Sequence, residues 1–421
     1  MNVFKFGGAS IESVGRARNM TELIAGYSDE HLLVVISAKG KTTNALEEVV
    51  KEYVQEEQEK AMALFETLKQ DHREYASELL GGEDIQLWNR MQELCTEVDW
   101  LLNEKPVRSH DYYYDQIVCI GELLSTAILQ AYMQSQGISS CWIDIRDVMK
   151  TDDQYRDATV LWDKTRERTL QVIGEAFVLH RVVVTQGFIG STDDNASVTL
   201  GREGSDYTAA VLANCLDAAG VTIWKDVPSL LNADPKIFPN TVPIREISFR
   251  EVIEMAYYGA QVIHPKTIKP LQNKHIPLYV KCFLDKKLPG TVIHELDTAI
   301  AYPPIMVLKT NQTLLQVSTR DYSFITEDNL SRIYTLFHDC RIKINMIQNA
   351  AISFLACIDT HPEKISMLLG LLQSEYVVKR NENLFLFTVR HYTQHVLDEE
   401  LKNRTVLLEQ KTRTTIQMVV Q

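Results

Sequence analysis

The sequence lacks the cysteine and histidine patterns that bind a structural metal or build a disulfide framework. Its seven cysteines include no CxxC pair and no Cys/His spacing typical of zinc; they are Cys95, Cys119, Cys141, Cys215, Cys282, Cys340 and Cys357. We expect them to be small, buried hydrophobic side chains. A basic excess is missing too, because the formal net charge is −13. A general nucleic-acid or anionic-membrane binder needs a basic face, so neither class is expected.

Long apolar runs are also missing, since none approaches the roughly 20 residues that span a bilayer. The N-terminus runs directly into Val3-Phe4-Lys5-Phe6, without the basic and apolar regions of a secretory signal. These absences predict a cytoplasmic protein. The 421 residues, 45% of them hydrophobic, can bury sizeable cores, and this length favours two or three domains.

Short apolar runs that end in glycine or polar turns recur in the first two thirds of the chain. We expect strands at 3–6, 31–36, 181–186, 221–224 and 277–282. Several are apolar at nearly every position, as in a parallel sheet covered by helices on both faces, and helical patterns separate them. The sequence therefore predicts an α/β domain at 1–298, with a mainly parallel sheet between helices. A charged stretch at about 44–103, broken at Gly81-Gly82, predicts a helical insertion.

The pattern changes after Tyr302-Pro303-Pro304, because a proline pair interrupts both helices and sheets. A βαββαβ unit is expected at 305–380, followed by a shorter βαββ unit at 381–421. The expected strands are 313–318, 343–349, 352–359, 377–379, 384–389, 406–409 and 415–420, and the expected helices are 327–339, 362–375 and 394–401. The repeat predicts paired ferredoxin-like α+β domains, with an interleaved arrangement of the two as an alternative.

The turn from Lys5 to Ser10 lies between the first predicted strand and the first predicted helix. Gly7 and Gly8 let the backbone approach a phosphate chain, the helix start offers free N–H groups, and Lys5 adds a positive charge. A glycine turn with an incidental lysine would have the same sequence. Gly40-Lys41-Thr42 is not the end of a P-loop, because Val35 stands where its first glycine is required.

Two further segments favour a ligand site at the edge of the sheet. In the turn from Thr199 to Ala210, Arg202 can bind a carboxylate, while Ser205 and Asp206 could either cap the following helix or face a ligand. Gly187-Phe188-Ile189-Gly190 follows a predicted strand, where open parallel sheets bind their ligands.

Two other segments are weaker signals. Glu122 follows Gly121 at the start of an apolar helix, where it either complements the helix dipole or binds an ammonium group. Trp224-Lys225-Asp226-Val227 and the later segment 232–236 are, on their own, most simply polar turns after a strand.

These segments occur in the order seen in aspartate kinases of the amino-acid kinase superfamily, which the first two thirds of the chain resemble. The matching segments are Lys5–Ser10, Ser37-Ala38 with Thr43-Asn44, Gly121-Glu122, Gly187–Gly190, Gly201–Tyr207, Ala233-Asp234-Pro235 and Gly259–Pro265. The tail resembles the tandem ACT domains of those kinases. The resemblance implies ATP-dependent phosphorylation of the L-aspartate side chain to 4-phospho-L-aspartate, the first step of lysine, threonine and methionine biosynthesis. It also implies Mg²⁺ on the phosphates, with no direct protein ligand predicted.

The resemblance also assigns roles to residues of this sequence. Lys5 contacts the transferring phosphoryl group, and Asp206 orients Lys5 and the substrate ammonium or a metal-bound water. The implied substrate-binding residues are Ser37, Thr43, Glu122 for the α-ammonium, Phe188, Arg202 for the α-carboxylate, and Ser205. The implied nucleotide-binding residues are Lys5, Gly7, Gly8, Ser10, Lys225, Asp226, Leu231, Lys236 and Gln261. The β-carboxylate of aspartate has an unperturbed pKa of about 3.9, so it is already ionised and needs no general base.

The chain departs from the best-known aspartate kinases at its nucleotide-binding residues. Lys225 stands where threonine is common, Leu231 where tyrosine is common, and Lys236 in place of arginine. Gln261 replaces a lysine that often reaches the nucleotide. We hypothesise that Lys225 supplies the phosphate-directed charge that Gln261 lacks, so that Lys225→Ala should raise the KM for ATP; an unchanged KM would show the idea to be wrong.

The resemblance further implies an amino-acid effector, such as lysine or threonine, near Ser323-Phe324-Ile325 and Asn345, and a homodimer joined through the ACT domains. Asn345 occupies a position that is often aspartate in lysine-inhibited relatives, and its uncharged amide would pair less strongly with an ammonium group. A dimerisation module that binds nothing is the alternative for the tail. For the whole chain, the alternatives are a kinase of another acidic amino acid, such as N-acetylglutamate or glutamate, and a non-catalytic amino-acid sensor.

Overall fold

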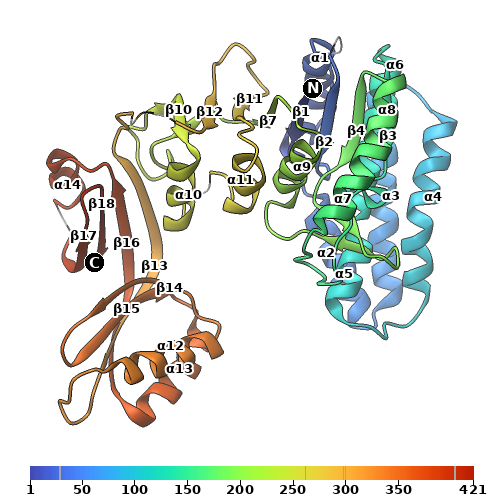
Figure 1. Cartoon of the computed structure of the whole chain (residues 1–421). Helices are drawn as coiled ribbons and strands as arrows, with labels where there is room; N and C mark the ends of the chain where they lie inside the picture. Colours follow the sequence, from blue (N-terminus) through green and yellow to red (C-terminus); the bar gives the residue numbers. More distant parts are fainter. Residues whose placement is uncertain (28–29, 261, 297, 299, 403) are drawn as a thin grey trace. The chain divides into compact units, whose positions relative to one another are not determined.

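The computed structural model describes all of the chain except residues 28–29, 261, 297, 299 and 403. The chain forms two compact units (Figure 1). The first contains Met1–Leu230, Arg245–Ile253 and Ile263–Asp297, and the second contains Leu231–Ile244, Glu254–Val262 and Thr298–Gln421.

Within the described residues, an eight-stranded sheet in the order β10-β12-β11-β7-β1-β2-β4-β3 forms the centre of the first unit. Its strands are β1 (Asn2–Phe6), β2 (Leu32–Ile36), β3 (Ser140–Ile143), β4 (Val182–Gln186), β7 (Gly220–Lys225), β10 (Glu246–Ser248), β11 (Leu278–Cys282) and β12 (Thr291–His294). All neighbouring pairs are parallel except β11 with β12. All residues of β2 and β4 are buried, because helices cover both faces of the central strands.

The helices of the first unit are α1 (Val14–Ala25), α2 (Thr42–Val54), α3 (Gln58–Leu80), α4 (Ile85–Asn103), α5 (His110–Val118), α6 (Ile120–Ser135), α7 (Trp162–Arg168), α8 (Gly174–Leu179), α9 (Gly204–Cys215) and α11 (Pro265–Gln272), with the start of α10 (Phe249–Tyr258). Helix α9 packs on β1, β2 and β7, and α6 packs on β2, β3 and β4. The shorter elements of the first unit are η1 (Gly8–Ile11), η2 (Ile145–Asp147), η3 (Thr169–Ile173) and the hairpin of β5 (Ile189–Ser191) with β6 (Ser197–Thr199). The pair of β8 (Leu230–Leu231) with β9 (Pro243–Ile244) lies where the chain passes from the first unit to the second.

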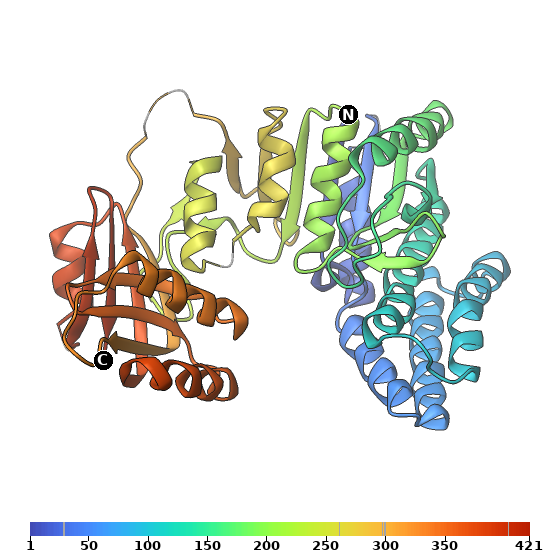
Figure 2. The same cartoon turned by 60° about the horizontal axis from the view of Figure 1, so that its bottom comes forward.

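The charged stretch at 44–103 is helical, as its composition suggests. Helices α3 and α4 form a hairpin that turns at Gly81, whose φ of 76° is a left-handed conformation that glycine adopts without strain. Asp84 begins α4, since its carboxylate accepts the N–H groups of Gln86 and Leu87. Figure 2 shows these blue helices extending away from the sheet of the first unit.

One helical stretch, His110–Ser135, is long and apolar enough to cross a membrane by length and composition alone. However, 89% of its most apolar window is buried inside the protein. This burial is that of a core helix, so the stretch gives no support for a membrane span.

The second unit contains a six-stranded antiparallel sheet in the order β14-β15-β13-β16-β18-β17. Its elements are β13 (Ile305–Ser318), α12 (Glu327–Asp339), β14 (Ile344–Asn349), β15 (Ser353–Asp359), α13 (Pro362–Glu375), β16 (Val377–Arg390), α14 (Gln394–Glu400), β17 (Val406–Lys411) and β18 (Thr415–Val420). Helices α12 and α13 pack side by side over a core that contains Leu315, Phe337 and Leu368.

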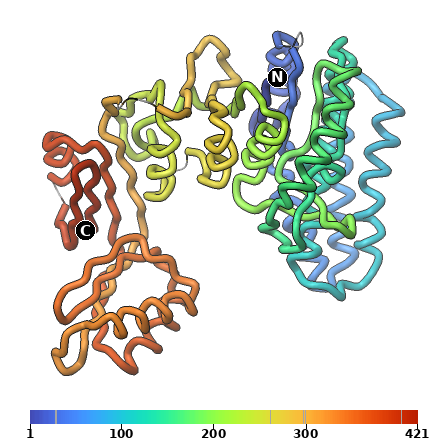
Figure 3. The backbone as a smooth tube through the Cα atoms, in the orientation of Figure 1, coloured from blue at the N-terminus to red at the C-terminus, as the bar shows by residue number. Residues whose placement is uncertain are grey.

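Two of the expected strand limits in this unit are wrong. The segments expected at 377–379 and 384–389 belong to the single strand β16, and β13 begins at Ile305 rather than at Thr313. Both strands are long because each serves two halves of the sheet (Figure 3). The end of β13 pairs with β15 and with the start of β16, whereas residues 305–309 pair with residues 386–390.

The shorter βαββ unit therefore gains a fourth strand from the start of β13. The register shifts between Lys309 and Gln312, where the two halves of the sheet meet. In place of a second helix, Ala233 and Phe238 join α14 in covering this half of the sheet, against Phe387 and Met418. The domain limits 305–380 and 381–421 stay predictions, because these shared strands belong to both halves.

Candidate active site

A cavity of about 460 Å³ lies in the first unit, where β1, β2 and β4 end. It is lined by Lys5, Ser37, Thr43, Tyr114, Glu122, Arg156, Phe188, Thr199, Gly201, Arg202, Glu203, Gly204, Ser205 and Asp206. This lining includes all the residues that the sequence predicted to be catalytic or to bind the substrate. The carboxyl ends of parallel strands are where open α/β sheets bind ligands, so this cavity is the candidate active site.

Lys5 and Asp206 form an ion pair in the cavity. Lys5 comes from β1 and Asp206 from the first turn of α9, and Lys5 Nζ lies 2.7 Å from Asp206 Oδ1. The two side chains are only 12% and 6% exposed. The ammonium group is therefore held in a fixed position at the cavity wall, as a group that stabilises developing charge must be.

Gly8 allows the loops after β1 and β2 to approach closely. A Cβ atom at Gly8 would lie 2.5 Å from the carbonyl oxygen of Ala38, so that even alanine would not fit without a backbone shift. The Gly40 N–H donates to the Gly8 carbonyl at 3.1 Å. Gly7 directly precedes η1, which gives the turn after Lys5 the helix-start character expected for a phosphate-binding loop.

The loop after β4 packs directly on the start of α9. A Cβ atom at Gly187 would lie 2.5 Å from Ser205 Cβ, and Phe188 adopts a φ of 72°. The Ser37 hydroxyl donates to Ser205 Oγ at 2.9 Å. Helix α9 begins after Glu203 without a side-chain capping bond, so neither Ser205 nor Asp206 is an N-cap residue. Both side chains instead line the cavity.

Glu122 has one carboxylate oxygen without a partner. Its side chain is buried, and Oε1 accepts the Ala38 N–H at 3.2 Å. Oε2 has no hydrogen-bond partner among the described residues. Burial raises the pKa of Glu122 to about 8, against smaller opposing effects of the Ala38 N–H and of the Lys5 charge. A buried carboxylate with an unpartnered oxygen in a cavity suits a cationic ligand group.

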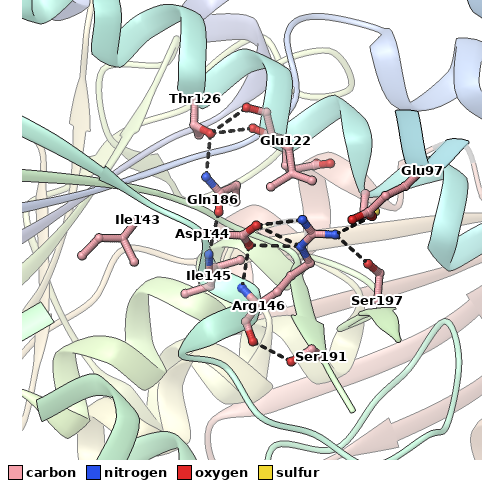
Figure 4. A network of polar contacts seen from close by, with 12 residues as sticks. Glu97, Glu122, Thr126, Ile143, Asp144, Ile145, Arg146, Gln186, Ser191 and Ser197 are labelled. Atoms are coloured by element: carbon pink, nitrogen blue, oxygen red, sulfur yellow. Dashed lines mark hydrogen bonds and ion pairs between the residues drawn. The ribbon is translucent and has the colours of Figure 1, made fainter. Parts of the chain in front are cut away.

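Behind Glu122, a hydrogen-bond network fixes the start of α6 against the end of β4 (Figure 4). Thr126 Oγ1 donates to the Glu122 carbonyl at 2.8 Å and accepts from Gln186 Nε2 at 2.7 Å. Gln186 Oε1 accepts the Ile145 N–H at 2.7 Å. Since Gln186 directly precedes Gly187, the network couples the position of Glu122 to the Phe188 loop.

Arg202 and Glu203 differ in whether other protein groups bind their side chains. Arg202 is exposed, and its guanidinium makes no hydrogen bond or ion pair within the described part of the chain. Glu203 has the left-handed φ of 54°, and its Oε2 accepts the His264 N–H at 2.8 Å. Arg202 thus has all its donors available for a carboxylate.

Six lining residues had been given no role from the sequence. Thr199, Gly201, Glu203 and Gly204 lie inside a recognised segment, but Tyr114 and Arg156 lie in none. One signal was present beside them: Asp115 is a charged residue at the buried end of α5, in the apolar stretch before α6. A buried carboxylate needs hydrogen-bond donors, and here they come from the turn that carries Arg156 and from Thr199 at the end of β6.

The predicted nucleotide-binding residues are spread over both units. Gly7, Gly8 and Ser10 follow Lys5, and Lys225 ends β7, one residue beyond the partner of Phe6 in β1. Asp226 is exposed in the next turn. Leu231 and Lys236 belong to the second unit, and Gln261 lies outside the described residues. Of those that the structure describes, only Lys5 lines the cavity, and the roles of all of them stay predictions.

The predicted effector residues all lie in the second unit. Ser323 bonds Asp321 through both its N–H and its hydroxyl, and Phe324 is 73% exposed. Ile325 packs against the core beneath α12 and α13. Asn345 is hydrogen-bonded by its own chain, as described below, and these residues too stay predictions.

Among the described residues, no group of three or more His, Cys, Asp or Glu side chains could hold a metal ion.

Comparison with known proteins identifies the family. Residues 1–282 match the amino acid kinase family. Aspartokinase 1, chloroplastic, of Arabidopsis thaliana is 30% identical over 398 residues, which cover 91% of this chain and 67% of that protein.

The chain belongs to the aspartokinases of the amino acid kinase family. Aspartokinase 2, chloroplastic, of the same plant is 31% identical over 85% of the chain, and the chain spans only 66% of its length. The crystal structure of Escherichia coli aspartokinase III in complex with aspartate and ADP (R-state) has a TM-score of 0.80 and 25% identity, covering 100% of this chain and 96% of that one. The fold is the amino-acid kinase fold followed by tandem ferredoxin-like ACT domains.

Proposed function

We propose that the protein is an aspartate kinase, which transfers the γ-phosphoryl group of ATP to the side-chain carboxylate of L-aspartate. The observation that carries the proposal is the content of one cavity. Glu122 offers an unpartnered carboxylate oxygen, Arg202 offers a guanidinium, and Lys5 is held there by Asp206. These groups are complementary to the ammonium, the α-carboxylate and the transferring phosphoryl group, respectively.

The reaction needs positioning and positive charge rather than a base. The β-carboxylate of aspartate is ionised at neutral pH, so it attacks the γ-phosphorus directly and ADP departs. Lys5 stabilises the charge on the transferring oxygens, and Asp206 keeps its ammonium in place. Glu122 and Arg202 hold the two α-substituents, which turns the β-carboxylate toward Lys5.

ATP use is supported by the complex of Escherichia coli aspartokinase III with aspartate and ADP. Mg²⁺ is part of the proposal, because bound Mg²⁺ would neutralise phosphate charge during the transfer. The described residues fit an ion held mainly by phosphate oxygens and water, since they contain no acidic cluster to bind it alone. Asp206 is the carboxylate beside Lys5 that would hold a water of its shell.

Lysine as a feedback effector is likewise a proposal. It is supported by the crystal structure of Escherichia coli aspartokinase III in complex with lysine and aspartate (T-state), which has a TM-score of 0.81 to this chain. A homodimer joined through the second unit is proposed from the resemblance of the sequence alone, and the cytoplasmic location stays the prediction made from the sequence.

The test is an acyl-phosphate assay that traps the product with hydroxylamine. Aspartate, glutamate and N-acetylglutamate are compared at equal concentration with ATP and Mg²⁺, with and without lysine and threonine. We expect hydroxamate from aspartate above all, and a rate that falls with lysine. Preference for another acidic substrate would contradict the proposal, and no product from any of the three would favour a non-catalytic sensor.

A further inference from the structure

Arg156 is a second arginine on the cavity wall, outside every segment that pointed to the family. Its backbone has a φ of 71°, a left-handed conformation that costs a non-glycine residue on the order of 1 kcal/mol or more. Such strain persists only where surrounding contacts enforce it, and it concentrates at functional sites. The contacts of Arg156 show what enforces it.

A buried carboxylate fixes the backbone of Arg156. Asp115 is completely buried, and its Oδ2 accepts the N–H groups of Arg156 and Thr199, each at 2.9 Å. Its Oδ1 accepts the Thr199 hydroxyl at 2.7 Å. Burial raises the pKa of Asp115 to about 6, although these hydrogen bonds favour the ionised form. Thus Asp115 joins two segments of the cavity wall, and one of them carries Arg156.

Contacts within the protein position the side chain of Arg156 and leave most of its hydrogen-bond donors available. Its guanidinium lies over the ring of Tyr114, 4.4 Å from the centroid, which orients the plane of the group. Its only ion pair within the described residues is with Asp111 Oδ1 at 3.3 Å. The two side chains are 48% and 55% exposed, so water screens this pair and it contributes little. Most of the guanidinium donors remain available to a ligand.

The charges around the cavity decide which ligand group Arg156 faces. Of the other cations, Lys5 is paired with Asp206 at the reacting end, and Arg202 is open. Of the anions, Glu203 is turned to the His264 N–H and Glu122 suits an ammonium group. The attacking β-carboxylate must stay free to reach phosphorus, so the remaining anionic group of aspartate is its α-carboxylate.

We propose that Arg156 is a specificity-determining residue that shares the substrate α-carboxylate with Arg202. This inference rests on the proposed aspartate kinase function. Two guanidinium groups on one carboxylate make the site select amino acids whose α-carboxylate is free. A charged hydrogen bond of this kind contributes about 1.5–3 kcal/mol, equivalent to roughly 10- to 100-fold in substrate affinity.

The test compares L-aspartate with its α-amide, which keeps the reacting β-carboxylate and lacks the α-carboxylate charge. Wild-type enzyme, Arg156→Gln, Arg156→Gly and Asp111→Asn are assayed for kcat and KM with both substrates, and for the KM of ATP. Arg156→Gly relieves the left-handed strain, so it keeps the test valid if Arg156→Gln folds poorly. Asp111→Asn removes the surface ion pair and leaves the guanidinium, which makes it the matched control.

We expect both Arg156 variants to raise the KM for aspartate about tenfold or more, with the KM for ATP unchanged. The preference for aspartate over its α-amide, as the ratio of kcat/KM values, should fall by a similar factor, whereas Asp111→Asn should keep or increase it. A purely structural role would lower kcat/KM for both substrates equally and leave the ratio unchanged, which would overturn the inference. If wild-type enzyme phosphorylated neither substrate, the proposed function itself would be wrong.

Discussion

The cavity of the first unit and the region around Asn345 differ in whether other protein groups bind their polar side chains. In the cavity, Glu122 Oε2 has no partner and Arg202 makes no ion pair within the described residues. Around Asn345, the polar side chains form hydrogen bonds with one another. Lys309 Nζ donates to Asn345 Oδ1 at 2.9 Å, and Asn345 Nδ2 donates to Gln312 at 2.9 Å and to Asp359 at 3.0 Å. Groups without a protein partner in a cavity are available to a ligand, whereas a network of hydrogen bonds within the chain stabilises the fold.

This difference bears on two hypotheses: that aspartate binds in the cavity, and that an amino-acid effector binds near Asn345. A buried carboxylate with an unpartnered oxygen costs free energy until a ligand binds it, so the cavity is preorganised for a cation. An effector ammonium that approached Asn345 would instead compete with the ammonium of Lys309. Burial raises the pKa of Asp359, but hydrogen bonds from Gln312 and Asn345 hold this pKa below its usual value. Asp359 is therefore the anionic group of that network.

The largest effect is expected at Lys5. Lys5→Met should lower kcat by about 10²- to 10³-fold, because it removes the charge that stabilises the transferring phosphoryl group. It also leaves Asp206 without its ion-pair partner, so thermal unfolding should be measured alongside the hydroxamate rate. Lys51→Met is the matched control and should change neither, since Lys51 is an exposed helical lysine that forms an ion pair with Glu48 on the same helix. Retention of more than a tenth of wild-type kcat in Lys5→Met would rule out the assigned role.

Glu122 should control the pH dependence of substrate binding. Its pKa is about 8 without ligand, so at pH 6.5 most molecules carry a neutral Glu122 that must lose its proton to pair with the substrate ammonium. The KM for aspartate should therefore fall as pH rises from 6.5 to 8.5. In Glu122→Gln, the KM should be about 10- to 100-fold higher and this pH dependence should be absent. A Glu122→Gln enzyme with the wild-type pH profile would disprove the assignment.

The smallest effect on ligand response is expected at Asn345. Asn345→Ala removes three hydrogen bonds from a part-buried network, so it should lower the free energy of unfolding by about 1–3 kcal/mol. It should change the lysine concentration for half-inhibition by less than about threefold, because the amide is already bound within its own chain. Loss of lysine inhibition with unchanged stability would reverse the comparison and place the effector at Asn345.

The sequence predicted the parts of the site that follow directly on strands or begin helices. Lys5, Glu122, Phe188 and Asp206 were found because glycine-containing turns mark those positions. Arg156 was missed, because its place on the wall depends on Asp115, a residue distant in sequence that binds its backbone. Such pairing arises from tertiary packing, and the sequence next to Arg156 itself carries no pattern that reveals it.

The same reason explains the errors in the second unit. The middle of β16, from Lys379 to Glu382, is polar and exposed, so the sequence pattern indicated a break between two strands. It remains a strand because it pairs with β13, which is distant in sequence. The start of β13 was missed in the same way, since its pairing partner is the end of β16.

The central claim is that the open groups of the cavity are open for aspartate. It is tested most directly by counting the protons exchanged when aspartate binds. Titration calorimetry at pH 7 with ADP present, in buffers of different ionisation enthalpy, gives this number. With a pKa of about 8, Glu122 should release about 0.9 proton per aspartate bound by wild-type enzyme, and Glu122→Gln should release none. No proton release by the wild type, or equal release by both proteins, would contradict the claim.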